Sequence, residues 1–296
     1  MRFTRTKALA TAVLLAAALA ACGDAGDDAD EGADVDVAEG CDDFESGTTM
    51  ADLCESGEVT IGVKFDQPGI GFQGAADDEP TGFDIEMAKI VAGALGIEES
   101  GITWEETISD NREPFLIEKK VDLVLASYSI TPERQAVVGQ AGPYFITGQQ
   151  LLVTSDNDTI EGPEDTEGEE VCSVSGSTSI ETIEKEYGAT ARGFGTYSEC
   201  VEQVLNGSFD AMTTDGAILL GYAAERPDEL KVVGPEFSEE NIGIGYQDPK
   251  DTAMCEFLGE TIEQSYEDGT WEQAFDSTLG EAGVDAPEPP EVQPCP

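Results

Sequence analysis

Apolar and polar positions alternate along residues 59–65, and this period of two predicts a β-strand. The apolar positions are Val59, Ile61, Val63 and Phe65. Lys64 then points away from the apolar face, near the carboxyl end of the strand. Residues 87–95 place apolar side chains at helical spacing, and Gly96 is positioned to end that helix.

Strand and helix continue to alternate along the chain. After the segment 112–120, residues 121–126 form a nearly continuous apolar run, which is typical of a strand in a parallel sheet covered on both faces. A helix beginning at Pro132 and a strand over 149–153 follow. This order predicts an α/β fold with ligand positions at the carboxyl ends of its strands.

A polar loop over 155–170 opens a second unit of the same kind. Its expected elements are a strand over 171–174, a turn over 175–178, a helix closed by Gly188, and strands over 209–214 and 231–233. The chain is then expected to turn through 241–247 into a helical stretch over 252–279. The proline-rich residues 285–296 are expected to run along the surface, fixed by Cys295.

The carboxyl end of the 121–126 strand carries groups that suit a carboxylate. Ser127 and Ser129 offer donors there, and Thr131 can cap a helix with Pro132 at its first position. Arg134 then falls in the first turn, so an anion would meet a guanidinium and free N–H groups together. An arginine on a solvated helix face is the alternative interpretation.

The first 21 residues have the features of a signal peptide, with three basic residues before an uncharged run too short to span a bilayer. They end in Leu19-Ala-Ala-Cys22, which is similar to a bacterial lipobox, so we expect Cys22 to be lipidated. Residues 23–40 are poor in large apolar side chains and are expected to form a disordered tether. No later segment reaches transmembrane length.

The chain is strongly acidic, with 63 acidic and 14 basic residues, no histidine and a formal charge of −49. Removing the three basic residues of the signal peptide leaves 11 basic against 63 acidic residues, or −52. This charge excludes nucleic acid and anionic lipid as partners. Adaptation to high salt is our hypothesis for the acidity. No calcium-binding loop motif and no Cys/His metal motif is present.

Seven cysteines divide into Cys22 for the lipid and six for disulfides. Six cysteines allow 15 connectivities. Locality favours Cys41–Cys54, Cys172–Cys200 and Cys255–Cys295.

Several motifs resemble the extracellular solute-binding proteins of ABC importers for polar amino acids, over residues 58–279. They are Thr81-Gly-Phe-Asp-Ile-Glu86, Ser129-Ile-Thr-Pro-Glu-Arg134, Ser175-Gly-Ser-Thr178 and Thr213-Thr-Asp215. Three further segments resemble glutamate-binding lipoproteins of Gram-positive bacteria: Gly62-Val-Lys-Phe-Asp-Gln-Pro68, Asn111-Arg-Glu-Pro-Phe115 and Val171-Cys-Ser-Val-Ser-Gly-Ser177.

The resemblance implies a two-lobed periplasmic-binding-protein (Venus flytrap) fold with two hinge crossings, near Gln149 and Ile242. We therefore expect a signal peptide over 1–21, a tether and N-terminal segment over 22–57, lobe 1 over 58–148 plus 243–296, and lobe 2 over 149–242.

The resemblance also implies how the groups common to all amino acids are bound. Arg134 occupies the position that binds the α-carboxylate, assisted by the positions of Ser129, Ser177 and Thr178. Asp215 occupies the position that binds the α-ammonium. An ordinary polar turn at 175–178 is the alternative.

We expect specificity to depend on two cations. Lys64 stands where relatives that bind lysine, arginine or glutamine often carry an aspartate, and Arg112 stands where acidic amino-acid binders carry a second cation. Together they suit a side-chain carboxylate. Tyr197 and Ser127 match positions that line the side-chain end. Surface roles for Lys64 and Arg112 are the alternatives, and core packing is expected for Phe65, Phe72 and Trp104.

The sequence thus predicts a monomeric, lipid-anchored binding protein on the extracellular face of the membrane, without a cofactor or a metal. It would capture glutamate and deliver it to an ABC permease. The alternatives are binding of aspartate or glutamine, a receptor sensing domain, or a dehydratase-like enzyme on the same fold. The absence of histidine removes the commonest acid–base group.

Overall fold

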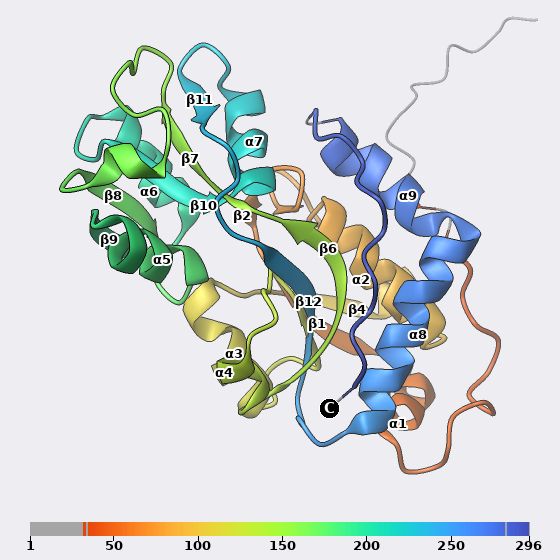
Figure 1. Cartoon of the computed structure of the whole chain (residues 1–296). Helices are drawn as coiled ribbons and strands as arrows, with labels where there is room; N and C mark the ends of the chain where they lie inside the picture. Colours follow the sequence, from red (N-terminus) through yellow and green to blue (C-terminus); the bar gives the residue numbers. More distant parts are fainter. Residues whose placement is uncertain (1–31, 34, 282, 296) are drawn as a thin grey trace, which may run out of the picture. The chain divides into compact units, whose positions relative to one another are not determined.

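A computed structural model of the chain describes residues 32–33, 35–281 and 283–295 (Figure 1). The signal peptide, Cys22 and the tether up to Glu31 lie outside these residues. Within the described residues, no helix has the length and apolar character needed to cross a membrane.

Two five-stranded sheets form the framework. The first has the order β4-β1-β5-β12-β6. Its strands are β1 (Val59–Val63), β4 (Ile102–Glu106), β5 (Leu123–Leu125), β6 (Gly139–Thr147) and β12 (Glu240–Tyr246). β1 pairs in parallel with β4 and β5, whereas β12 is antiparallel to both β5 and β6. We call this sheet with its helices lobe 1.

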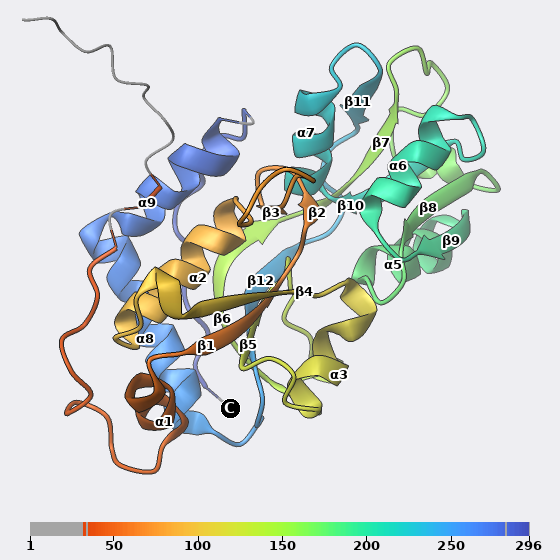
Figure 2. The same ribbon diagram turned by 180° about the vertical axis from the view of Figure 1, so that it is seen from behind.

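The second sheet has the order β11-β7-β10-β8-β9, and with its helices it is called lobe 2. Its strands are β7 (Gln149–Thr154), β8 (Glu170–Val174), β9 (Thr190–Phe194), β10 (Ala211–Asp215) and β11 (Leu230–Val233). A short hairpin of β2 (Asp66–Gln67) and β3 (Gly71–Phe72) projects from lobe 1 toward α6 and α7 (Figure 2).

Helices cover both sheets. They are α1 (Thr49–Ser56), α2 (Phe83–Ala94), α3 (Arg112–Ile117), α4 (Pro132–Gln135), α5 (Thr178–Tyr187), α6 (Tyr197–Leu205), α7 (Gly216–Glu225), α8 (Thr252–Asp268) and α9 (Thr270–Phe275). β5 shows how the first sheet is covered on both faces: Leu123 and Leu125 pack in the cluster that contains α2, whereas Val124 packs with Leu116 of α3. The continuous apolar run of the sequence reflects this burial.

The chain crosses between the sheets twice. It leaves β6 for β7 at Gly148, and it returns from β11 to β12 through residues 234–239. Residues 241–247 were expected to form a turn, but residues 240–246 form β12, the neighbour of both β5 and β6. The glycines and the polar Asn241 obscured the alternation of this strand. The expected single helix over 252–279 is interrupted at Gly269, whose φ of 86° ends α8.

Part of the expected tether is ordered. Ala38 donates its N–H to the carbonyl oxygen of Gly93 at 2.9 Å, and Val35 lies so close to Gly93 that a Cβ there would be 2.5 Å from its Cγ1. The prediction of a disordered tether is therefore wrong for residues 35–40. The absence of a side chain on Gly93 of α2 permits the close contact that orders this segment.

The structure forms all three expected disulfides, Cys41–Cys54, Cys172–Cys200 and Cys255–Cys295. The last bond fixes residues 285–295, which lack helix and strand, and Gln293 donates its N–H to the carbonyl oxygen of Gly142.

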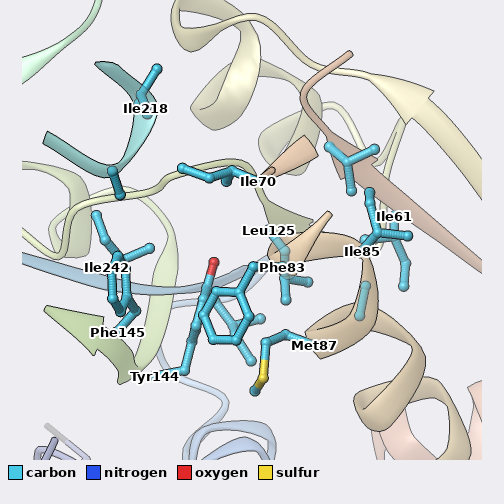
Figure 3. Packing of buried hydrophobic residues seen from close by; sticks show 14 of the residues in the cluster. Ile61, Ile70, Phe83, Ile85, Met87, Leu125, Tyr144, Phe145, Ile218 and Ile242 are labelled. Carbon is cyan, nitrogen blue, oxygen red and sulfur yellow. The ribbon is translucent and has the colours of Figure 1, made fainter. Parts of the chain in front are cut away.

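Buried aromatic side chains fill the centre of lobe 1. Phe83 makes edge contacts with Phe145, Trp271 and Phe275, with ring centroids 5.5–5.9 Å apart. The hydroxyl of Tyr144 projects from the same cluster (Figure 3). This rigid centre supports the residues at the carboxyl ends of β1 and β5.

Candidate functional site

Arg134 is positioned by the local structure that its sequence predicts. Thr131 is the N-cap of α4, with Pro132 at the first position, and the Thr131 hydroxyl accepts from the Arg134 N–H at 3.2 Å. The guanidinium donates to the carbonyl oxygens of Ser129 at 2.7 Å and Gly176 at 2.9 Å. Since Gly176 belongs to lobe 2, Arg134 bridges the two lobes.

The turn that Arg134 contacts requires glycine. Gly176 has a φ of 77°, and a Cβ there would lie 2.6 Å from Oδ1 of Asp110 in lobe 1. Ser177 caps α5 by accepting from the Ile180 N–H. Together with Arg134 and Thr178, these residues line a cavity of about 450 Å³.

Thr178 faces a carboxylate that the sequence did not indicate. Its hydroxyl donates to Oε2 of Glu240 at 3.1 Å, and Ser238 donates to Oε1 at 3.1 Å. Glu240 is buried at the start of β12, next to the second crossing. The hydroxyl of Thr178 is thus already bonded to Glu240. For the expected contact with an α-carboxylate, this hydroxyl would have to rotate, or another group of the turn would have to donate instead.

Asp215 lies at the carboxyl end of β10, immediately before α7, and is 5 % exposed. Burial, with the nearby charge of Glu240 second, raises the pKa of Asp215 to about 8. A cation placed beside this carboxyl would favour its ionised form. The position therefore suits an ammonium group.

Lys64 is buried directly after β1, with 2 % of its surface exposed. Its ammonium donates to the Ser109 hydroxyl at 2.8 Å and lies 5.7 Å from the centre of the Tyr197 ring. It forms no ion pair within 4.0 Å among the described residues. Burial, followed by repulsion from Arg112, lowers the pKa of Lys64 to about 7.

Arg112 is equally buried but well satisfied. Its guanidinium donates to four carbonyl oxygens at 3.0–3.2 Å, those of Ser109, Ala126, Ser127 and Gly176. Burial, followed by repulsion from Arg134, lowers its pKa to about 10. These bonds fix the end of β5 and bridge to lobe 2, so Arg112 has little free donor capacity for a ligand.

Ser127 adopts a left-handed conformation, with a φ of 46°, that few serines occupy. Its N–H donates to Oδ2 of Asp84 at 2.8 Å, and Tyr144 donates to Oδ1 at 2.6 Å. Burial raises the pKa of Asp84 to about 6. Asp84, Ser127 and Asp215 line a cavity of about 10 Å³, which has room for about one water.

Tyr197 begins α6 and connects the lobes through its backbone. Its N–H donates to Oδ2 of Asp66 at 2.7 Å, while its hydroxyl accepts from Thr214 at 2.9 Å. Asp66 belongs to the β2–β3 hairpin, so this hairpin joins lobe 1 to lobe 2.

The structure thus brings Lys64, Arg112, Ser127, Ser129, Arg134, Ser177, Thr178, Tyr197 and Asp215 to the facing edges of the two lobes. Phe65 and Trp104 are half-buried and pack against the core. The sequence reasoning gave no role to Asp66, Gln67, Asp84 or Glu240. Asp84, Asp66 and Gln67 had a signal, because they lie within motifs of the family resemblance, but Glu240 had none.

Two lobes that meet over buried cations and acids are typical of a protein that binds a small polar solute. Comparisons with known proteins agree. The family of bacterial extracellular solute-binding proteins, family 3, matches residues 59–281. The glutamate-binding protein GluB of Corynebacterium efficiens is 38 % identical over 252 residues, which cover 81 % of this chain and 85 % of that protein. The glutamine-binding protein GlnH of Bacillus subtilis is 30 % identical, covering 79 % and 85 %.

Solved structures show the same fold. An ancestral arginine-binding protein bound to glutamine has a TM-score of 0.70 and 31 % identity, covering 76 % of this chain and 98 % of that one. An ancestral amino acid-binding protein, described as a precursor of cyclohexadienyl dehydratase, has a TM-score of 0.70 and 29 % identity, covering 78 % and 100 %.

The chain belongs to the family 3 bacterial extracellular solute-binding proteins. It is an amino acid-binding protein that serves an ABC transporter. The relatives named above are binding proteins and not enzymes.

Proposed function

We propose that this protein binds L-glutamate between its lobes for delivery to an ABC permease. The observation that carries the proposal is the buried ammonium of Lys64, which has one hydroxyl partner and no ion pair within 4.0 Å among the described residues. A buried charge without an opposite charge is unfavourable, so the site favours a ligand that supplies a carboxylate there.

The other groups fit the remainder of an amino acid. Arg134 would bind the α-carboxylate in exchange for its present partners, the carbonyl oxygens of Ser129 and Gly176 and the carboxylate of Glu113 at 3.2 Å. Asp215 offers an acceptor to the α-ammonium. The two GluB relatives, 38 % and 35 % identical, are glutamate-binding proteins and support the same ligand. Glutamine is the second candidate, because GlnH is a glutamine-binding protein.

Thermal unfolding with a panel of amino acids tests the ligand. We expect L-glutamate to raise Tm more than aspartate, glutamine or lysine at equal concentration, since it alone pairs Lys64 at the right length. Arg134→Ala and Asp215→Ala should each lose binding of every amino acid, by about 2–5 kcal/mol. A larger rise of Tm with glutamine than with glutamate would reject the proposed ligand.

We also propose that acyl chains on Cys22 hold the protein on the outer face of the membrane. The support is the Leu19-Ala-Ala-Cys22 sequence at the end of the signal peptide. Mass spectrometry of the membrane-bound protein should find Cys22 acylated, and Cys22→Ser should release the protein into the medium. An unmodified Cys22 in membrane-bound protein would reject this anchor.

A further inference from the structure

Gln67 at the end of β2 has a donor without an acceptor. The side chain is fully buried, and its Oε1 accepts from the Ser127 hydroxyl at 2.5 Å. Its Nε2 is buried and has no hydrogen-bond partner among the described residues. A buried amide donor without an acceptor is costly, so most proteins avoid one.

The hydrogen bond from Ser127 holds this amide beside the candidate site. Ser127 lines the one-water cavity with Asp84 and Asp215, and its left-handed backbone is held by the bond from its N–H to Asp84. Gln67 lies three residues after Lys64 on the same segment. The unpaired donor therefore lies beside Ser127, on the segment that carries Lys64.

The neighbours of Gln67 make its burial depend on closure of the lobes. Asp66 accepts from the Tyr197 N–H, and its carbonyl oxygen accepts from the Tyr222 hydroxyl. Pro68 packs against α7 so closely that a Cβ on Gly221 would be 2.2 Å from the Pro68 carbonyl oxygen. Closing the lobes thus removes the Gln67 amide from water, and a ligand oxygen would restore its lost hydrogen bond.

We propose that Gln67 is a ligand-binding residue whose Nε2 donates to a side-chain oxygen of the bound amino acid. The inference rests on the proposed function and deepens it. Gln67 recognises an oxygen, whether of a carboxylate or of an amide, whereas Lys64 recognises negative charge. Closure over an amino acid that lacks this oxygen leaves the amide unpaired, so such amino acids are rejected.

Titration calorimetry of the full chain with L-glutamate and L-glutamine tests this role. Gln67→Met keeps the length of the side chain and removes the donor, so we expect both ligands to bind about tenfold more weakly, with their affinity ratio unchanged. Gln67→Glu replaces the donor by an acceptor and should weaken glutamate further than Gln67→Met does. Tm of the ligand-free variants should stay within a few degrees of the parent.

Gln247→Met is the matched control. Gln247 donates to Val121 and Asp122, which directly precede β5 at the end of the strand opposite the site, so this variant should bind both ligands as the parent does. Binding within twofold of the parent by Gln67→Met, or by Gln67→Glu where Gln67→Met fails to fold, would overturn the inference. If the parent itself prefers glutamine, the proposed ligand fails, and the tenfold loss for glutamine still tests Gln67 separately.

Discussion

The regions around Lys64 and Arg112 bury two cations to the same extent but satisfy them very differently. Both side chains are 2 % exposed. Lys64 has one hydroxyl partner, whereas Arg112 donates to four carbonyl oxygens from three segments of the chain. The guanidinium of Arg112 is therefore well hydrogen-bonded without a ligand, and the ammonium of Lys64 is not.

This difference separates a structural cation from a recognition cation. The sequence presented Lys64 and Arg112 as a pair that serves the ligand carboxylate. The planar guanidinium reaches several carbonyl oxygens at once, so it holds the end of β5 in place. The single ammonium of Lys64 remains available, and ligand specificity should depend mainly on it.

The largest expected effect concerns the stability of the ligand-free protein. Arg112→Met should lower the free energy of unfolding by about 3–5 kcal/mol, because buried carbonyl oxygens lose their donors. Lys64→Met should change it by less than about 1 kcal/mol or increase it, because an unpaired buried charge is removed. Urea denaturation followed by circular dichroism measures both. Equal losses in the two variants would erase the distinction between the two cations.

The pH dependence of glutamate affinity should distinguish the two cations next. Lys64, with a pKa of about 7, must be protonated to pair the ligand carboxylate, and Asp215, with a pKa of about 8, must be ionised to pair the ammonium. Affinity should therefore fall up to tenfold per pH unit below about 7, where protons hold Asp215 neutral. It should fall again above about 8, where Lys64 is neutral. Between about 7 and 8 it should stay level, because the loss of charge on Lys64 offsets the ionisation of Asp215.

Arg112 stays charged throughout this range, since its pKa is about 10. Titration calorimetry from pH 5.5 to 9 in parent and Lys64→Met should show that the variant loses the alkaline decline, with its affinity rising until about pH 8 as Asp215 ionises. An alkaline decline that persists without Lys64 would assign it to another group.

The smallest expected effect is that of salt on association. Glutamate carries −1 and approaches a mature chain with a formal charge of −52, which is 11 basic against 63 acidic residues, so long-range steering is repulsive. The Debye length falls from about 10 Å at 0.1 M to about 3 Å at 1 M salt, which screens distant acids more than buried cations. Stopped-flow on-rates should therefore rise a fewfold over this range. A steady decrease, with the fold intact, would mean that the field of the cations extends into solvent.

The sequence predicted most of the framework because its signals were local. The alternation around Lys64, the cap at Thr131 and the apolar run before Ser127 each correspond to an observed element. β12 was missed because its glycines conceal its pattern, and it is held by its neighbours β5 and β6. The ordering of residues 35–40 depends on a close contact with Gly93, which no local signal reveals.

The site was less predictable. The motifs predicted Arg134 and Asp215 as site residues, and the structure places both at the facing edges of the lobes. The motifs did not reveal that Arg112 is bound to carbonyl oxygens. Nor did they give a role to Gln67 or Glu240. The hydrogen-bond partners of these two residues come from segments distant in sequence, which meet only in the folded chain. Hydrogen-bond satisfaction is a property of the folded chain, so it could not be read from spacing.

A cycle of two proteins and two ligands tests most directly whether Lys64 selects the ligand by its charge. Affinities of parent and Lys64→Met for L-glutamate and L-glutamine are measured by titration calorimetry at pH 7. We expect the variant to lose glutamate by about 2 kcal/mol or more, roughly thirtyfold, and to keep glutamine within about threefold. Equal losses for the two ligands would contradict the claim that Lys64 reads the side-chain carboxylate.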